Sequence, residues 1–312
     1  MVTLPLASLH SSLLPTTPSS SSSNKSCLNT TRRNSIILAS SILASFLDLS
    51  VSNTIPSSYK LARALDVDEF QEQEDRVVHL FQETSPSVVL IRDIEIDKNF
   101  ESTNEVMLPK DEDVKIEGTG SGFVWDKAGH IVTNYHVIEK LATNASGLQR
   151  CKVLFVDTSG NSFSKEGKLI GFDPAYDLAV LKVDVEGNEL KPVMLGTSRD
   201  LHVGQCCFAI GNPYGYENTL TTGVVSGLGR EIPSPNGSAI RGAIQTDAAI
   251  NAGNSGGPLI DSYGRVIGVS TSTFTRKGSG LSSGVNFAIP VDTVVKTIPY
   301  LIVKGTPFSN RY

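Results

Sequence analysis

Short apolar runs recur along the chain from residue 88 onward, and they constrain the possible fold more than any other feature. Each run is three to six residues long, and Gly, Pro, Asp or Asn separates it from the next. This pattern is typical of antiparallel strands in barrels or sandwiches. We therefore predict an all-β fold with strands at residues 88–91, 122–125, 131–133, 152–156, 168–170, 179–183, 205–210, 223–226, 243–246, 258–260, 266–270 and 285–289.

Helices are expected only at the two ends of this region. A helix over residues 66–82 is predicted because its apolar residues, among them Phe70 and Phe81, recur with helical spacing. A short C-terminal helix is predicted over residues 291–304, where Pro299 should break or kink it.

One serine stands in a turn that is unusually rich in small residues. Residues 253–258 read Gly-Asn-Ser-Gly-Gly-Pro. Gly253 can adopt a positive φ without steric cost, which lets successive backbone N–H groups converge on one point. Such convergence is the geometry of an oxyanion hole, here formed by Gly253, Asn254 and Ser255. An ordinary turn without catalytic function is the alternative.

A nucleophilic serine needs a base, and the base needs an orienting carboxylate. His136 follows an apolar run and is the candidate base. Asp177 follows an Asp-Pro turn and precedes an apolar strand, so its side chain should be buried and should need a partner. The order His136, Asp177, Ser255 is that of chymotrypsin-like proteases. Each residue alone is compatible with a surface or turn role, but the three in this order favour catalysis. No catalytic role is predicted for His10, His79, His130 or His202.

Several segments together resemble the Deg/HtrA (Do-like) family of serine endopeptidases. They read GSGFV at 120–124, TNYHV at 133–137, DLAVL at 177–181, GNPYG at 211–215 and TTGVVS at 221–226, beside the serine segment itself. The resemblance runs from about residue 85 to residue 290. It implies a trypsin-like protease domain over 85–312, built as a chymotrypsin-like pair of six-stranded antiparallel barrels. His136 and Asp177 would come from the first barrel and Ser255 from the second.

The resemblance also implies further site and contact residues. The residues predicted to shape the primary specificity pocket are Ile250, Asn251, Thr271, Ser272 and Thr273. The helical segment 65–84 would help to build a homotrimer through Phe70 and Phe81. A mixed ring with a PDZ-bearing Do-like protease is the other assembly considered, because no PDZ domain fits into residues 291–312.

The mechanism implied by these residues requires no metal or cofactor. The acidic run 111–113 lies in an expected polar loop and is interpreted as solvated. A structural divalent cation such as Ca²⁺ on its carboxylate oxygens is the alternative, although no binding motif supports it.

The first 64 residues have the composition of targeting segments. Residues 1–31 are rich in Ser, Thr and Pro and contain no acidic residue, which is typical of a chloroplast transit peptide. Residues 32–64 combine Arg32-Arg33, a short apolar stretch and Ala62-Arg63-Ala64, which indicates a twin-arginine-like signal for the thylakoid lumen. That stretch is shorter than the roughly 20 apolar residues of a membrane span. A disordered leader is the alternative.

Charge and cysteine content exclude other classes of protein. The chain has a formal net charge of −5, although its first 64 residues carry five basic side chains and one acidic one. An acidic chain has no electrostatic reason to bind nucleic acid. Cys151, Cys206 and Cys207 follow the leader, an odd number without metal-ligand spacing. Buried free cysteines are the expectation, and a redox role is the alternative.

The sequence thus predicts a serine endopeptidase of the thylakoid lumen. It would degrade unfolded or damaged proteins, including those of photosystem II, and lie peripherally on the lumenal side of the thylakoid membrane. A non-catalytic or conditionally active scaffold or holdase subunit is the alternative function.

Overall fold

The computed structural model describes residues 57–96, 114–143, 148–157, 159–187, 189–212, 218–251, 253–271 and 284–307. The chain divides into two compact units, Met1–Val67 and Asp68–Tyr312. Of the first unit, only the beginning of helix α2 (Ser57–Thr84) is described, so the predicted transit peptide and most of the predicted signal lie outside the described residues. Both β-sheets belong to the second unit.

The first sheet has the strand order β5-β4-β1-β2-β3-β7-β6, and its neighbouring strands are all antiparallel. The bounds are β1 (Val88–Ile96), β2 (Val114–Val124), β3 (His130–Thr133), β4 (Gln149–Val156), β5 (Ser162–Glu166), β6 (Lys168–Asp173) and β7 (Leu178–Lys182). Only Gly167 separates β5 from β6, so the two edges of the sheet are one bent strand. A Cβ on Gly167 would lie 2.8 Å from a methyl group of Val153, which explains a glycine at this bend. Counted this way, the sheet is a closed six-stranded barrel.

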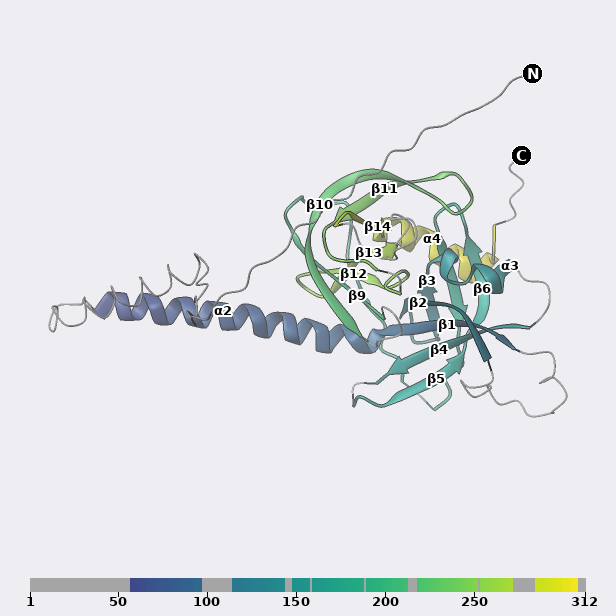
Figure 1. Cartoon of the computed structure of the whole chain (residues 1–312), viewed down its shortest axis with the longest axis horizontal. Helices are drawn as coiled ribbons and strands as arrows, with labels where there is room; N and C mark the ends of the chain where they lie inside the picture. Colours follow the sequence, from purple (N-terminus) through teal and green to yellow (C-terminus); the bar gives the residue numbers. More distant parts are fainter. Residues whose placement is uncertain are drawn as a thin grey trace, which may run out of the picture. The chain divides into compact units, whose positions relative to one another are not determined.

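The second sheet has the order β12-β9-β10-β11-β14-β13-β8, and an additional pairing of β12 with β13 closes six of these strands into a barrel. The bounds are β8 (Met194–Leu195), β9 (Cys206–Gly211), β10 (Thr219–Pro233), β11 (Ala239–Thr246), β12 (Pro258–Asp261), β13 (Arg265–Thr271) and β14 (Asn286–Pro290). The short β8 adds to this barrel in parallel with β13. Figure 1 shows the strands of the two barrels as separate groups, with α4 (Val291–Lys304) beside them.

The predicted fold class is confirmed, since every predicted apolar run overlaps a strand. The two strands that the prediction missed are β5, with the polar sequence SFSKE, and the two-residue β8. It also missed the short helix α3 (Glu139–Thr143) and the 3₁₀ turns at Ser85–Ser87 and Tyr135–Val137.

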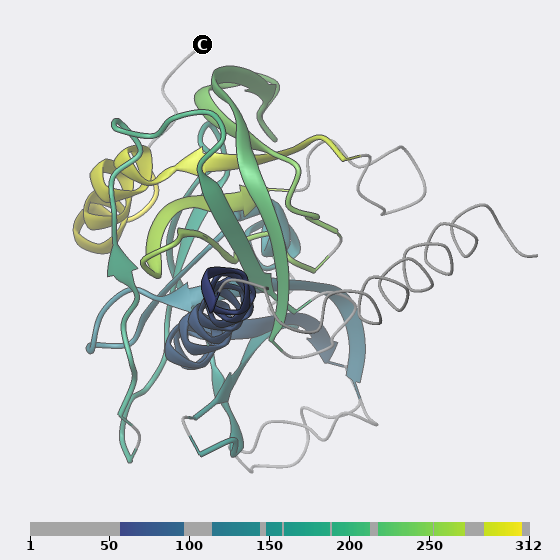
Figure 2. The ribbon, with the colours of Figure 1, turned by 90° about the vertical axis from the view of Figure 1, so that its left-hand side faces the viewer.

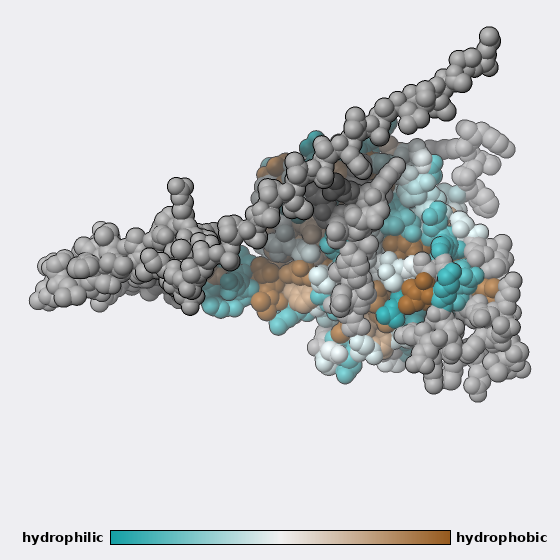
Figure 3. Space-filling view, in the orientation of Figure 1, coloured by the Kyte–Doolittle hydropathy of each residue, from teal (hydrophilic) through white to brown (hydrophobic). Residues whose placement is uncertain are grey.

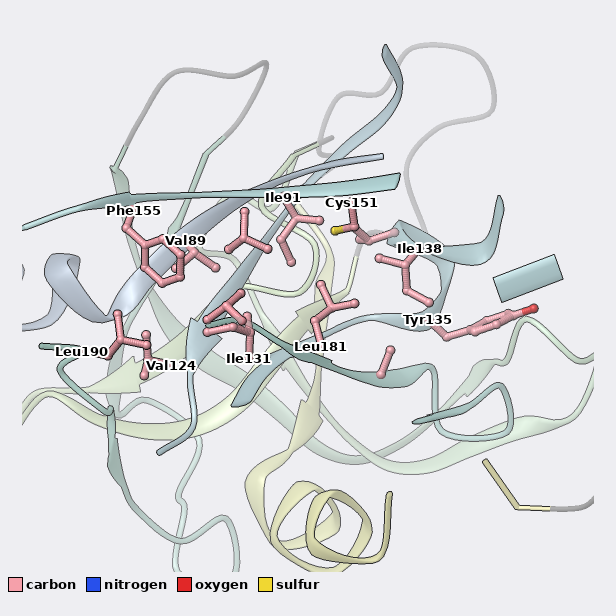
Figure 4. Close-up of a cluster of buried hydrophobic side chains, with 14 residues drawn as sticks. Val89, Ile91, Val124, Ile131, Tyr135, Ile138, Cys151, Phe155, Leu181 and Leu190 are labelled. Atoms are coloured by element: carbon pink, nitrogen blue, oxygen red, sulfur yellow. The ribbon is translucent and has the colours of Figure 1, made fainter. Parts of the chain in front are cut away.

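The interior of the first barrel is filled by buried side chains that point toward one another (Figure 4). Val89 and Ile91 come from β1, Ile131 from β3, Cys151 from β4 and Leu181 from β7. Burying one such aliphatic side chain contributes about 1.5–3 kcal/mol. This core fixes β3 and β7, whose ends carry His136 and Asp177.

A second cluster joins the two barrels. It brings Phe123 and Val132 of the first barrel together with Val269 and Ile289 of the second. Helix α4 covers this cluster and contacts strands of both sheets, namely β6, β7, β13 and β14. Figure 2 shows α4, in yellow, along one side of the barrels. Its buried residues are Val291, Val294, Ile298 and Leu301.

Both predicted helices are present, with two differences from expectation. Helix α2 begins at Ser57, earlier than the predicted residue 66. Helix α4 continues through Pro299 to Lys304, so the proline does not end it. The packing of its apolar face on both barrels compensates for the backbone hydrogen bond that proline cannot make.

The surface mixes polar and apolar residues. Hydrophilic and hydrophobic residues are interspersed on the described surface in view in Figure 3. Exposed apolar side chains include Met194, Val203 and Tyr263. Among the residues that the structure describes, no helix has both the length and the apolar character needed to cross a membrane.

Candidate active site

His136 and Asp177 form a hydrogen-bonded pair at one end of the first barrel. His136 lies in the 3₁₀ turn after β3, and Asp177 lies in the turn before β7. The distance between His136 Nδ1 and Asp177 Oδ2 is 2.8 Å, and the backbone N–H of His136 donates to Asp177 Oδ1 at 3.0 Å. The Asp177 side chain is inaccessible to solvent, whereas the His136 side chain is 29% exposed. The expected partnership of a buried aspartate with an imidazole is therefore present.

The backbone of Asp177 is held in an uncommon conformation. Its φ is +54°, in the left-handed region that non-glycine residues seldom adopt. Its carbonyl oxygen accepts hydrogen bonds from the side-chain amide of Asn134 at 2.8 Å and from the N–H of Tyr135 at 3.2 Å. These bonds hold the turn so that the carboxylate faces His136.

A strand of the second barrel also binds Asp177. Thr271, at the end of β13, donates its hydroxyl to Asp177 Oδ2 at 3.1 Å. The same carboxylate oxygen thus binds His136 from the first barrel and Thr271 from the second. We predicted that Thr271 would shape the specificity pocket, and this contact with Asp177 was missed.

The turn that carries Ser255 packs directly against the histidine segment. Gly256 has a φ of +85°, and a Cβ there would lie 2.4 Å from Thr133 Oγ1 and 3.0 Å from the Asn134 nitrogen. Only glycine permits this approach, which brings Ser255 beside the turn of His136. Ser255 itself is 3% exposed.

The backbone N–H groups of this turn have different roles. Gly253 has a φ of +104°, and its N–H has no acceptor among the described residues. The N–H of Asn254, in contrast, already donates to the Asn251 carbonyl at 3.1 Å, and its side-chain amide donates to Ala249. Asn254 therefore stabilises the turn, and its own N–H is not directed at an oxyanion.

The other residues predicted for the specificity pocket lie in different environments. Ile250 is completely buried in the core of the second barrel. Asn251 is partly buried at the entrance of the serine turn. Ser272 and Thr273 lie outside the described residues, as do the acidic run 111–113 and residues 213–217.

The two aromatic residues predicted to make trimer contacts differ in exposure. Phe70 is 70% exposed. Phe81 packs with Val77 and Leu80 onto a buried cluster that includes Phe208 and Ile260 of its own chain.

The three cysteines that the structure describes are free, and they differ from one another in burial. Cys151 and Cys207 are buried, as expected, whereas Cys206 is exposed. The expectation of burial was wrong for Cys206, because alternate residues of strand β9 point to opposite faces. Burial raises the pKa of the Cys207 thiol to about 11 and the pKa of Cys151 further still. Within the described ranges, no three His, Cys, Asp or Glu side chains gather in a group that could hold a metal ion.

Comparisons with known proteins identify the family of this chain. Residues 120–269 match the family described as Trypsin-like peptidase domain. The chain is 63% identical over 288 residues to Protease Do-like 5, chloroplastic, of Arabidopsis thaliana. The aligned residues cover 90% of this chain and 88% of the relative. It is 44% identical over 270 residues to Protease Do-like 1, chloroplastic, of the same plant. The aligned residues cover 86% of this chain and 57% of the relative.

Solved structures of the same family are also similar to this chain. The crystal structure of Deg5 is similar with a TM-score of 0.62 and 65% identity, over 75% of this chain and 98% of that one. The HtrA-type protease AlgW with a tripeptide is similar with a TM-score of 0.56 and 31% identity, over 72% of this chain and 63% of that one. The fold, the sequence identity and the extent of the match show that this chain belongs to the Do-like (Deg/HtrA) family of serine proteases.

Proposed function

We propose that this serine protease cleaves peptide bonds within proteins through His136, Asp177 and Ser255. The observation that carries the proposal is the hydrogen-bonded pair of His136 and Asp177, against whose segment the Ser255 turn packs. The proposal needs no metal or cofactor, because the base, the nucleophile and the oxyanion donors are all groups of the chain.

The proposed reaction proceeds through an acyl-enzyme. His136 takes the proton of the Ser255 hydroxyl as that oxygen attacks the peptide carbonyl, and Asp177 holds Nδ1–H so that Nε2 is the basic atom. The N–H groups of Gly253 and Ser255 receive the oxyanion. The tetrahedral intermediate collapses as the C–N bond breaks, and the leaving amine takes the proton from His136. Water then attacks the acyl carbonyl by the same steps, which releases the acid and restores Ser255.

We also propose that the enzyme acts in the thylakoid lumen, on the lumenal side of the membrane, and degrades damaged proteins such as those of photosystem II. Two observations support this proposal. The leader combines an acid-poor segment with paired arginines and a short apolar stretch. The Arabidopsis relatives are described as chloroplastic. Fractionation of chloroplasts tests the compartment, since recovery of the protein in stroma instead of lumen would refute it.

Labelling with a fluorophosphonate tests the catalytic proposal. We expect covalent modification at Ser255, located by mass spectrometry, and proteolysis of an unfolded protein substrate. Ser255→Ala should abolish both, and His136→Ala should slow both by several orders of magnitude while the protein stays folded. EDTA should leave both rates unchanged.

The alternative function makes the opposite prediction. A scaffold or holdase subunit would show no labelling, alone or in a ring with a PDZ-bearing Do-like protease, while it still suppressed aggregation of an unfolded substrate. That result would replace the catalytic proposal.

A further inference from the structure

Ser121 belongs to the first barrel, but its polar atoms bind the serine turn of the second. It lies on β2 and is completely buried. Its backbone N–H donates to the Ser255 carbonyl at 2.8 Å, and its hydroxyl donates to the Gly253 carbonyl at 2.6 Å. Ser121 therefore binds the carbonyl oxygens of the two residues that flank Asn254.

The direction of these hydrogen bonds is determined by the partners. A serine hydroxyl can donate one hydrogen bond and accept two. Ser121 Oγ accepts from the backbone N–H of Asn212 at 2.8 Å and from its side-chain amide at 3.3 Å. Because these groups only donate, the one proton of the hydroxyl goes to the Gly253 carbonyl, which only accepts. The hydroxyl thus uses its full hydrogen-bonding capacity.

The surroundings fix Ser121 itself. Its carbonyl accepts the Thr133 hydroxyl at 2.7 Å. A Cβ on Gly211 would lie 2.9 Å from Ser121 Oγ, so the neighbouring strand β9 approaches as closely as a glycine allows. Because the hydroxyl is completely buried, water does not compete for its hydrogen bonds.

We propose that Ser121 is a positioning residue that sets the orientation of the oxyanion donors, an inference that rests on the proposed function of the Ser255 turn. Gly253 has no side chain, and its φ of +104° lies in a region where only glycine is unstrained. Packing of its own side chain therefore cannot fix its peptide planes. The bond from Ser121 fixes the plane that follows Gly253, and the bond to the Ser255 carbonyl fixes the plane that follows Ser255. The Ser255 N–H lies on the peptide plane between these two anchors, and the Gly253 N–H lies on the plane directly before the first anchor. Ser121 thereby limits the rotation of both donors and keeps them directed toward a common point.

Ser121→Ala tests this role, and Ser270→Ala is the matched control. Ser270 is also a fully buried serine, but its hydroxyl has no hydrogen-bond partner among the residues that the structure describes, so its removal breaks no bond there. The measurements are the rate of fluorophosphonate labelling, kcat and KM for a chromogenic peptide, and the Ki of a peptide aldehyde, whose hemiacetal oxygen occupies the oxyanion position. Urea unfolding shows that each variant is folded under assay conditions.

For Ser121→Ala we expect kcat to fall about 10- to 100-fold, since loss of a direct oxyanion donor costs about 10²–10³-fold and a misplaced donor costs less. KM should stay close to the wild-type value, and the aldehyde Ki should rise by the same factor as kcat falls. Ser270→Ala should match the wild type in all three measurements. A purely structural role for Ser121 would lower stability and leave kcat and the aldehyde Ki of the folded protein unchanged.

The outcomes separate this inference from the proposed function. If the wild type itself is neither labelled nor active, the catalytic function is refuted together with the role of Ser121 in it. If the wild type is active and folded Ser121→Ala matches Ser270→Ala, only the role of Ser121 is refuted. If Ser121→Ala does not fold, Ser121→Cys keeps a weak donor and is compared with Ser270→Cys, again with a lower kcat at unchanged KM as the expected result.

Discussion

At the scale of single residues, Asp177 is the most heavily constrained group in the proposed site. Its carboxylate binds His136 and Thr271, and its carbonyl binds Asn134 and Tyr135. Each hydrogen bond contributes about 0.5–1.5 kcal/mol net. Together they offset the cost of a non-glycine residue at positive φ, which is of order 1–3 kcal/mol. The strain is thus compatible with a stable fold because hydrogen bonds from four residues, three of them consecutive in the turn 134–136, offset it.

The adjacent cysteines of β9 give a matched test of burial. The Cys207 thiol is buried and lies 3.1 Å from the Thr246 hydroxyl, and its pKa is raised to about 11, whereas Cys206 is exposed. A thiol with a raised pKa stabilises the fold fully below its unfolded pKa. That contribution is lost as the pH rises through about 9 to 11, because the unfolded chain ionises first.

We therefore predict that the free energy of unfolding falls more steeply between pH 8.5 and 10.5 in the wild type than in Cys207→Ala. Cys206→Ala serves as the control and should follow the wild-type slope. Urea denaturation at a series of pH values measures both. Equal slopes for Cys207→Ala and the wild type would refute the assignment of this pH dependence to the buried thiol.

At the scale of elements, three hairpin turns share one construction. Asp126, Asp157 and Asp261 each begin a turn with glycine three residues later, and one carboxylate oxygen accepts the N–H groups two and four residues on. The other oxygen binds the side chain of the fourth residue, which is His130, Asn161 or Arg265. Burial raises the pKa of Asp126, but the hydrogen bonds from His130 and Ala128, together with the charge of His130, outweigh this effect and lower the pKa overall. His130 therefore has a structural role in this turn.

Helix α4 provides a test of how the two barrels are joined. Val294 is completely buried against both barrels, whereas its neighbour Val295 is 42% exposed. We predict that Val294→Ala lowers the free energy of unfolding by about 2 kcal/mol through lost burial and the cavity that remains. Val295→Ala should change it by less than about 0.5 kcal/mol. Urea unfolding measures both, and equal effects would contradict the packing of this face.

At the scale of the whole molecule, the proposed site exists only where the two barrels meet. His136 and Asp177 come from the first, while Thr271 and Ser255 come from the second. The shared cluster around Phe123 and Val269 holds the barrels together, and Ser121 crosses between them by hydrogen bonds. Small shifts between the barrels should therefore affect activity before they affect the secondary structure.

Assembly is tested by the two aromatic residues of α2. Under the proposed trimer, Phe70→Ala should lower the sedimentation coefficient toward that of a monomer, because its exposed ring is free to contact another subunit. Phe81→Ala should instead lower the free energy of unfolding, since this ring packs on its own chain. A trimer that persists in Phe70→Ala would exclude Phe70 as a main contact.

The sequence by itself determined the strand-rich fold, the order His136, Asp177, Ser255 and the family motifs. Apolar runs and turn-forming glycines act locally, so they can be read from neighbouring residues. The strands that escaped this reading, β5 and β8, are polar or only two residues long, and tertiary pairing forms them. Likewise, a proline in the sequence predicts the end of a helix. Helix α4 nevertheless continues through Pro299, because its apolar face packs on both barrels.

Only the tertiary structure decided which polar groups meet. Ser121 and Gly253 are 132 residues apart in sequence, and Thr271 and Asp177 are 94 apart. It also decided which of the adjacent cysteines is buried and that Asn254 supports its turn through its own N–H. Such contacts depend on how distant strands pack, and no local pattern encodes them. The residues proposed to carry the chemistry are visible in the sequence, whereas the residues that hold them in place become visible only when the barrels come together.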